Sequence, residues 1–599
     1  MTWRPPRAIW PFVVVSAFCL WLTEWLYRAV DYAFVGGTTR YAIGRMARHG
    51  ELGRSLRRLE LPTHASTYDY PTPAVWAEAS DYNLIDWLLV SPTAAFMDFA
   101  PSWGAAQAAW VVMLALSTAW LARVVGCRGP GVVVAGCLAA TSWPFWHNIL
   151  TARGNMLIVS AGLVAIGAAI LTARSTSQML KQRRWSRWPS TAKWLLLLAV
   201  SGGLLLAVYP PLAVLLFLPG AVWLIPTLIR GSILGTIPVV VGLVAGVALA
   251  SPALSVIWET VSTTVQSVGV ENLLCPTAEF AVPSAFAALL QPPAVGAGPS
   301  LLTFSGAAIG SWALALGAPL ARQRRLAMSS LLVLAGLMAW LSLGPCHALP
   351  QDQLAGKLIA DYVPASAAQF WLKVMPIRDL GRLLVVALAI CAVLSGYTVH
   401  HLWQRPRWAY RILAISLGVI AVGHSTWIIR SELAHPANWA PAPPPVTAQY
   451  LNETAGEPSA ELPFDEVVQH LSVLHSPVSK RVNPMWPRGL SALEILEDPL
   501  ARADFLKAPS ASVRWLRQLG IGLIPAISPT AKEVYDTGLR WIFFDRKRCM
   551  LSDVEGLDGT CPHDTPAALT AVLGPPRILE EGVLLWDVNS AWKWQEQNR

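Results

Sequence analysis

The chain contains a series of long apolar segments, each close to the length that a helix needs to cross a membrane. A helix crosses the hydrocarbon core of a bilayer with roughly 20 apolar residues. By that measure about eleven segments are predicted to span a membrane: 9–30, 104–126, 130–149, 154–173, 192–209, 211–229, 232–256, 300–320, 326–345, 380–402 and 410–430. Only 14% of the residues are charged, against about 25% in soluble domains. The predicted fold class is therefore a polytopic α-helical membrane protein.

The basic residues predict how these helices are oriented. They gather in four clusters between predicted spans: Arg174 with Lys181, Arg183, Arg184 and Arg187; Arg230; Arg322, Arg324 and Arg325; and Arg405, Arg407 and Arg411. Short loops rich in Lys and Arg stay in the cytoplasm. An N-terminus inside and a C-terminus outside puts all four clusters inside. Because the charge of +9 is divided among these loops, no nucleic-acid partner is expected.

The loops and the tail predict three regions. Residues 1–430 form the transmembrane domain, with long outer loops at 31–103, 257–299 and 346–379. A stiff Pro-rich linker at 431–445 leads into an extracytoplasmic domain at 446–599. In that domain TAKEVYDTGL predicts a helix, whereas GLRWIFFDR and GVLLWDV predict buried strands, so an α/β fold is expected.

Four cysteines fall in segments that are predicted to lie outside. The predicted disulfides are Cys549–Cys561, which are close in sequence, and Cys275–Cys346, which joins two outer loops. An oxidising compartment permits such bonds. Four cysteines allow three pairings, and the sequence leaves the choice among them open.

Asp31 lies where the chain leaves the first span, a position to which the resemblance described below gives a role. An amphipathic run of alternating apolar and basic residues follows at 40–58, a pattern typical of segments that lie in the membrane interface. The spans themselves carry almost no ionisable residues, with Glu24 as the main exception. Proton or ion coupling uses such residues, so a transporter is the least favoured function.

The residues after the first span resemble a known motif. Asp31–Tyr32–Ala33–Phe34, then Thr38–Thr39–Arg40–Tyr41 and Arg48–His49–Gly50, are similar to the first-loop motif of the GT-C glycosyltransferase superfamily. This superfamily includes oligosaccharyltransferase catalytic subunits and mannosyl and aminoarabinose transferases. The resemblance implies a GT-C-like membrane domain. It also implies an enzyme that moves a sugar from a polyprenyl-phosphate carrier to an acceptor on the outer face.

The resemblance assigns roles to individual residues. Asp31 would act as the catalytic base, with Asp81 as a second carboxylate. Arg378, Arg382 and Arg40 would bind the donor phosphate, since arginine binds two phosphate oxygens at once. Alternatives remain open for each role. Asp31 could simply mark the lipid boundary, Asp81 could cap a helix, and the arginines could be interfacial anchors.

The chain also departs from the oligosaccharyltransferase pattern. The second outer turn, FWHNILTARGNM at 145–156, has no carboxylate where those enzymes carry a metal-binding acidic motif. Their WWD-type acceptor motif is absent too. We therefore predict no metal ligands and no certain cofactor, with a divalent metal as the less favoured alternative. We do not expect transfer to asparagine.

Together these features predict an inverting, lipid-linked sugar transferase of a bacterial inner membrane. Its expected partners are a polyprenyl-phosphate-linked sugar, membrane lipid and an envelope-assembly protein that binds the C-terminal domain. The alternative is a non-catalytic polytopic protein that handles envelope polysaccharide.

Overall fold

A computed structural model describes about half of the chain in two compact units. The helical unit takes in residues 1–29, 82–89 and 101–439, and the second, called here the C-terminal unit, takes in 30–81, 90–100 and 440–599. The described residues are 9–27, 34–35, 64–65, 74–75, 99–142, 145–146, 149, 158–182, 188–208, 220–222, 235–264, 309–320, 325–341, 382–433, 439–440, 457–462, 499, 502–503, 506–508, 510–521, 523, 525–545, 565–580 and 583–598.

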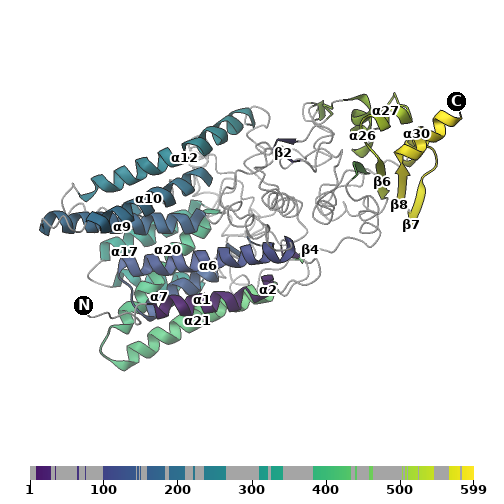
Figure 1. Ribbon diagram of the computed structural model, residues 1–599. Coiled ribbons are helices and arrows are strands. Elements are labelled where there is room, and N and C mark those ends of the chain that lie inside the picture. The colour runs from purple at the N-terminus through teal and green to yellow at the C-terminus, as the bar shows by residue number, and fades with distance from the viewer. Residues whose placement is uncertain are drawn as a thin grey trace, which may run out of the picture. The chain divides into compact units, whose positions relative to one another are not determined.

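The helical unit consists of apolar helices, most of which overlap predicted spans (Figure 1). They are α1 (Trp10–Leu22), α2 (Glu24–Tyr27), α6 (Phe99–Val125), α7 (Pro130–Ala140), α9 (Ile158–Gln182), α10 (Trp188–Val208), α12 (Ile237–Thr264), α16 (Ile309–Leu316), α17 (Arg325–Leu341), α20 (Arg382–Trp403) and α21 (Trp408–Leu433), with a short 3-10 helix η5 (Ala318–Leu320). The span predicted at 211–229 lies outside the described residues except for 220–222. Among the described residues, five helices are long and apolar enough to cross a membrane. The protein is therefore an integral membrane protein, and the count of about eleven spans stays a prediction.

One helix is clearly shorter than its predicted span. The segment 130–149 was expected to form one helix, but α7 ends at Ala140. Pro144 follows closely, and a proline disfavours helical geometry in the residue before it. The indole Nε1 of Trp146 then donates to the carbonyl of Ala140 at 2.7 Å, which satisfies one of the carbonyls at the end of α7.

Helix α20 is the centre of the helical unit, packed against α7, α16, α17 and α21. Gly131 and Gly396 let α7 and α20 approach so closely that a Cβ on Gly396 would lie 2.4 Å from the carbonyl oxygen of Gly131. On another side of α20, the hydroxyls of Ser395 and Thr398 donate to α16 carbonyls at 2.8 and 2.7 Å. Small residues and hydroxyl-to-carbonyl bonds are the usual means by which membrane helices associate.

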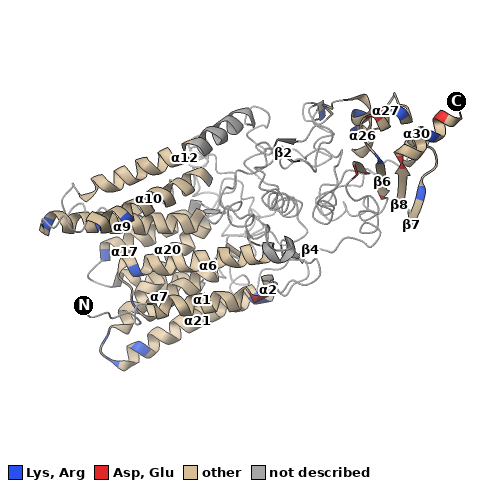
Figure 2. Ribbon diagram, viewed as in Figure 1, with Lys and Arg blue, Asp and Glu red and all other residues tan. Residues whose placement is uncertain are grey.

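The two ends of the helical unit differ in charge (Figure 2). At one end, called here the basic end, α9 and α20 end while α10 and α21 begin. Described basic residues gather there, including Lys181, Arg405, Arg407 and Arg411. At the other end, called the first-loop end, α1 and α21 end and α6 begins. The middle of the described helices carries almost no charge.

The C-terminal unit is built on a four-stranded sheet with the order β5-β6-β8-β7. Strand β5 (Ser459–Leu462) runs parallel to β6 (Trp541–Asp545), which pairs antiparallel with β8 (Val583–Asp587), and β8 pairs antiparallel with β7 (Arg577–Glu580). The helices of the unit are α26 (Ala511–Gly520), α27 (Ala531–Asp536), α29 (Thr565–Leu573) and α30 (Val588–Gln597). The helix and the two strands predicted from this part of the sequence are α27, β6 and β8.

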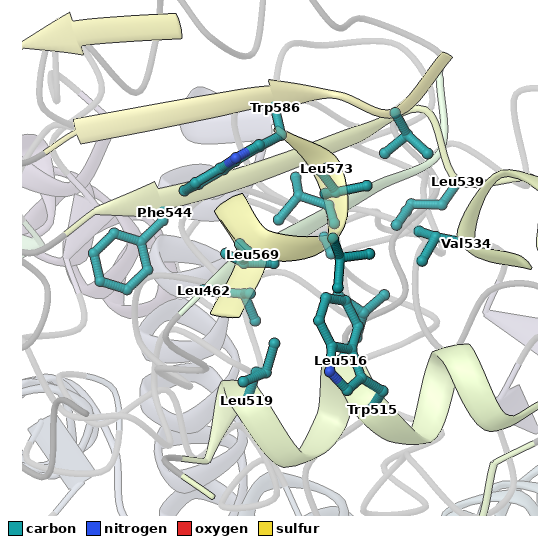
Figure 3. Close-up of a cluster of buried hydrophobic side chains, with 14 of the residues drawn as sticks. Leu462, Trp515, Leu516, Leu519, Val534, Leu539, Phe544, Leu569, Leu573 and Trp586 are labelled. Atoms are coloured by element: carbon teal, nitrogen blue, oxygen red, sulfur yellow. The ribbon is translucent and has the colours of Figure 1, made fainter. Parts of the chain in front are cut away.

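A core of large apolar side chains holds this unit together (Figure 3). Leu516 and Leu519 of α26, Leu569 of α29, and Phe544 and Trp586 of the sheet pack in it. Its helices begin with strong caps: Ser510 accepts a bond from the amide of Val513, and Asp587 accepts from two amides at the start of α30. Two further strand pairs are short: β1 (Phe34–Val35) with β4 (Trp439–Ala440), and β2 (His64–Ala65) with β3 (Ala74–Val75).

Candidate active site

Most of the predicted site residues lie outside the described residues. This holds for Asp31, Asp81, Arg40 and Arg378, and for the four cysteines of the predicted disulfides, Cys275, Cys346, Cys549 and Cys561. Arg382 is the exception, because α20 begins with it. The roles of these residues stay predictions. The candidate site is described below from the helices that are nearest to them in the sequence.

The helix before Asp31 ends in a defined way. The hydroxyl of Thr23, which is buried, donates to the carbonyl of Cys19 at 2.8 Å, and the amide of Thr23 bonds to the same carbonyl. This closes α1, after which the short α2 continues to Tyr27. Asp31 is four residues further along the chain, and four residues span at most about 14 Å.

The central helix begins at the same end. Helix α20 ends at the basic end and therefore starts, with Arg382, at the first-loop end. Two of the residues predicted to act on a substrate, Asp31 and Arg382, are therefore attached to helices that reach this end. The backbone amides at the start of a helix carry partial positive charge, which favours an anion nearby.

An arginine that the sequence argument did not single out lies at this end as well. The guanidinium carbon of Arg430, in the last turn of α21, lies 4.2 Å from the centre of the Trp21 ring in the last turn of α1. Its Nε is buried and, among the described residues, has no hydrogen-bond partner. The sequence did contain a signal for it. The segment TWIIRSEL places an arginine at the end of the last predicted span, and Asp31 likewise lies at the end of the first predicted span.

Two tryptophans and one glutamine of α6 make contacts near the second outer turn. Trp103 and Trp110 of α6 are buried and meet edge to face at 5.6 Å. Between them in sequence, Gln107 donates from Nε2 to the carbonyl of Ile149 at 3.2 Å. Ile149, within the segment that lacks the acidic motif, is therefore hydrogen-bonded to α6, the helix that follows the first loop.

The interior of the helical unit has no charged side chain among its described residues. The buried polar groups of residues 9–433 are serines, threonines, Gln107 and one histidine, His400, near the end of α20. Burying a charge within a bilayer costs several kcal/mol. The described helices thus carry no chain of acidic or basic groups through which an ion could pass, and charge is confined to the two ends.

An apolar groove lies between α1 and α6, with a volume of about 560 Å³. It is lined by Phe12, Val13, Ser16, Ala17, Leu20, Leu116 and Trp120. Val13 and Leu20 are about half exposed in it. A surface of this kind is suited to hydrocarbon and not to a charged head group.

The described residues contain no group of three or more His, Cys, Asp or Glu side chains that could hold a metal ion. Asp31 and Asp81 lie outside those residues. The four described cysteines, Cys19, Cys127, Cys137 and Cys391, are buried free thiols.

Several solved structures are similar to this chain. The archaeal oligosaccharyltransferase AglB from Archaeoglobus fulgidus, in complex with an inhibitory peptide and a dolichol-phosphate, matches 90% of this chain and 69% of its own at 11% identity, with a TM-score of 0.49. ArnT from Cupriavidus metallidurans in the apo state matches 96% and 97% at 13% identity, with a TM-score of 0.47. The arabinofuranosyltransferase AftD from Mycobacteria matches 90% and 37% at 13% identity, with a TM-score of 0.44.

All three are GT-C glycosyltransferases, the superfamily whose first-loop motif this sequence resembles. No protein-family model and no curated protein matches the chain.

Proposed function

We propose that this protein is a membrane glycosyltransferase that moves a sugar from a polyprenyl-phosphate-linked donor to an acceptor of the cell envelope. The reaction takes place at the first-loop end, which lies on the outer face of a bacterial inner membrane. One observation carries the proposal: the described interior of the helical unit is free of charge, while α2, the described helix that precedes Asp31 in the sequence, and α20, which starts with Arg382, both have an end at the first-loop end. A substrate with its tail in lipid and its phosphate at the surface matches that arrangement.

The chemistry follows from the residue types. The acceptor hydroxyl attacks the anomeric carbon of the donor, and the bond from that carbon to the phosphate oxygen breaks. Asp31 takes the acceptor proton, while polyprenyl phosphate leaves with the electron pair. A single displacement of this kind inverts the anomeric configuration. Asp81 is the second carboxylate, which orients the acceptor.

The leaving phosphate needs cations, and arginine suits it best because its planar fork binds two oxygens. Arg378, Arg382 and Arg40 take this role in the proposal. Arg382 has the strongest support, because it is the first residue of the central helix α20 and the amide dipoles of a helix start act in the same direction.

The C-terminal unit binds substrate or an envelope-assembly partner and has no catalytic role in this proposal. The Pro-rich linker joins it to the last span. The disulfides Cys549–Cys561 and Cys275–Cys346 belong to the same proposal, because all four thiols then lie in an oxidising compartment.

The test is a transfer assay in membrane vesicles with a panel of radiolabelled polyprenyl-phosphate sugars. Vesicles with the wild-type chain should transfer label from at least one donor, and vesicles without the chain should not. The anomeric configuration of the product tests inversion, and an EDTA arm tests the need for a metal. If no donor supports transfer and Asp31→Asn complements a deletion strain as well as wild type, the protein is a non-catalytic handler of polysaccharide.

A further inference from the structure

Arg430 has a setting that interfacial anchoring does not account for. An arginine that only anchors a helix extends its head group to water and keeps its stem in lipid. The guanidinium of Arg430 instead lies over Trp21 of a different helix, 4.2 Å from the ring centre, and its Nε is buried. That distance is well inside the range of about 6 Å over which a cation and an aromatic face attract each other.

The contact with Trp21 does not use the hydrogen-bond donors of Arg430. A cation over an aromatic ring is attracted by the electrons of the ring face and not through a hydrogen bond. Nε has no hydrogen-bond partner among the described residues. A buried donor without a partner is unfavourable, and because the side chain as a whole is only half-buried, a small shift of the guanidinium would let an oxygen ligand accept from it.

The charge of Arg430 specifies an anionic ligand, although the helix ends around it do not. Trp21 and Arg430 lie in the last turns of α1 and α21, so the carbonyl ends of two helices meet here. Helix C-termini carry partial negative charge. An anion can bind at this place only through a cation, and Arg430 supplies one that the Trp21 ring already holds in position. Arginine on a planar platform is suited to phosphate oxygens.

We propose that Arg430, held on Trp21, is a binding residue for the phosphate of the lipid carrier. The inference rests on the proposed function for the identity of the carrier, and it adds the last span to the site. The phosphate oxygens accept hydrogen bonds from the guanidinium edge, and the polyprenyl tail stays in lipid beside α1 and α21.

The chain offers a matched control for this arginine. Arg411 lies at the other end of the same helix and also faces a tryptophan, with its guanidinium carbon 5.8 Å from the ring centre of Trp403. Arg411→Gln therefore removes the same charge and the same kind of contact from α21, but at the basic end.

The test measures binding of polyprenyl phosphate to the purified full-length chain in lipid nanodiscs, by native mass spectrometry or thermal stabilisation. Arg430→Gln should weaken binding about tenfold or more, as expected for loss of a charged hydrogen bond worth 1.5–3 kcal/mol. Arg430→Lys should fall between, because it keeps the charge without the fork. Arg411→Gln should bind like wild type. Unliganded unfolding midpoints show whether each variant is folded.

Further arms separate the sources of phosphate. Polyprenol, which has no phosphate, should bind Arg430→Gln and wild type equally. Inorganic phosphate and phosphatidylglycerol should compete only weakly if the site takes the whole carrier. Wild-type affinity for polyprenyl phosphate in Arg430→Gln, or an equal loss of polyprenol binding, would overturn the inference. Because Asp31→Asn should still bind the carrier, a protein that binds but does not transfer refutes the proposed function and leaves the Arg430 site standing.

Discussion

The two units of this protein differ in the kinds of side chain that they bury. The described part of the helical unit buries no Asp, Glu, Lys or Arg and joins its central helix to neighbours through glycines and hydroxyls. The C-terminal unit buries Glu461, Arg517 and Asp545 beside a dense apolar core. The contrast reflects the two solvents. In lipid an imperfectly paired charge has no water to solvate it, so charge in the described part of the helical unit is confined to its ends.

The largest effect should come from the close contact of α7 and α20. Gly396→Leu would force a side chain to within 2.4 Å of the Gly131 carbonyl, and overpacking of this kind costs about 3 kcal/mol or more. We expect loss of monodisperse protein in size-exclusion chromatography. Gly423→Leu is the control, since a Cβ there meets nothing within 4 Å. Equal behaviour of the two variants would mean that small residues do not hold this unit together.

A buried charge of the C-terminal unit should matter next. A guanidinium N–H of Arg517 donates to the carbonyl of Lys507. Arg517→Met leaves that carbonyl without this donor, at a cost of about 1–3 kcal/mol. The unit should become more sensitive to limited proteolysis in the full-length protein, while the helical fragment stays intact. A Met variant that resists protease as well as wild type would show that this charge is not structural.

The hydroxyl bonds of α20 should contribute less. Thr398→Val removes the bond from Oγ1 to the Leu314 carbonyl, which measures 2.7 Å. Such bonds between membrane helices are worth about 0.6 kcal/mol on average, so the unfolding midpoint should fall by only a degree or two. If Thr398→Val lowered the stability of the protein as much as Gly396→Leu does, polar bonds would matter as much as close packing in this unit.

The smallest effect concerns a surface cap of the C-terminal unit. The amide and hydroxyl of Thr530 donate to the Glu533 carboxylate, at 2.6 and 3.0 Å, and hold the pKa of Glu533 below its usual value. A lowered pKa stabilises the folded state above the unfolded-state pKa, and this contribution is lost as pH falls through the folded-state value. Glu533→Gln should therefore flatten the acid limb of the stability curve slightly, as followed by the protease sensitivity of this unit. An unchanged acid limb would contradict the assignment.

Local signals in the sequence predicted much of the fold. The capping box at Thr530 and Glu533 and the apolar run WIFFD determine α27 and β6 from neighbouring residues alone. The length of α7 was misjudged because hydropathy continues through Pro144, although helical geometry does not. Such errors arise where one backbone constraint outweighs the apolar pattern.

The proposed phosphate site at Arg430 was harder to predict than the fold, because Arg430 and Trp21 are far apart in the sequence. Asp31 could be chosen from its position after the first span, but no local pattern indicates that Arg430 meets Trp21, about 400 residues earlier. That contact depends on how α1 and α21 pack, which periodicity does not encode. An arginine at the end of a span was visible, but its partner was not.

The most direct test of the proposed function is the sugar-transfer rate of Asp31→Asn in vesicles that contain equal amounts of folded protein. Asn cannot accept the acceptor proton, and loss of a general base typically costs 10²–10⁴-fold. We expect a loss of about 100-fold or more, whereas Glu60→Gln, in the same predicted loop, should transfer like wild type. A rate for Asp31→Asn within about twofold of wild type would contradict a catalytic role for this carboxylate, because a general base contributes far more than that.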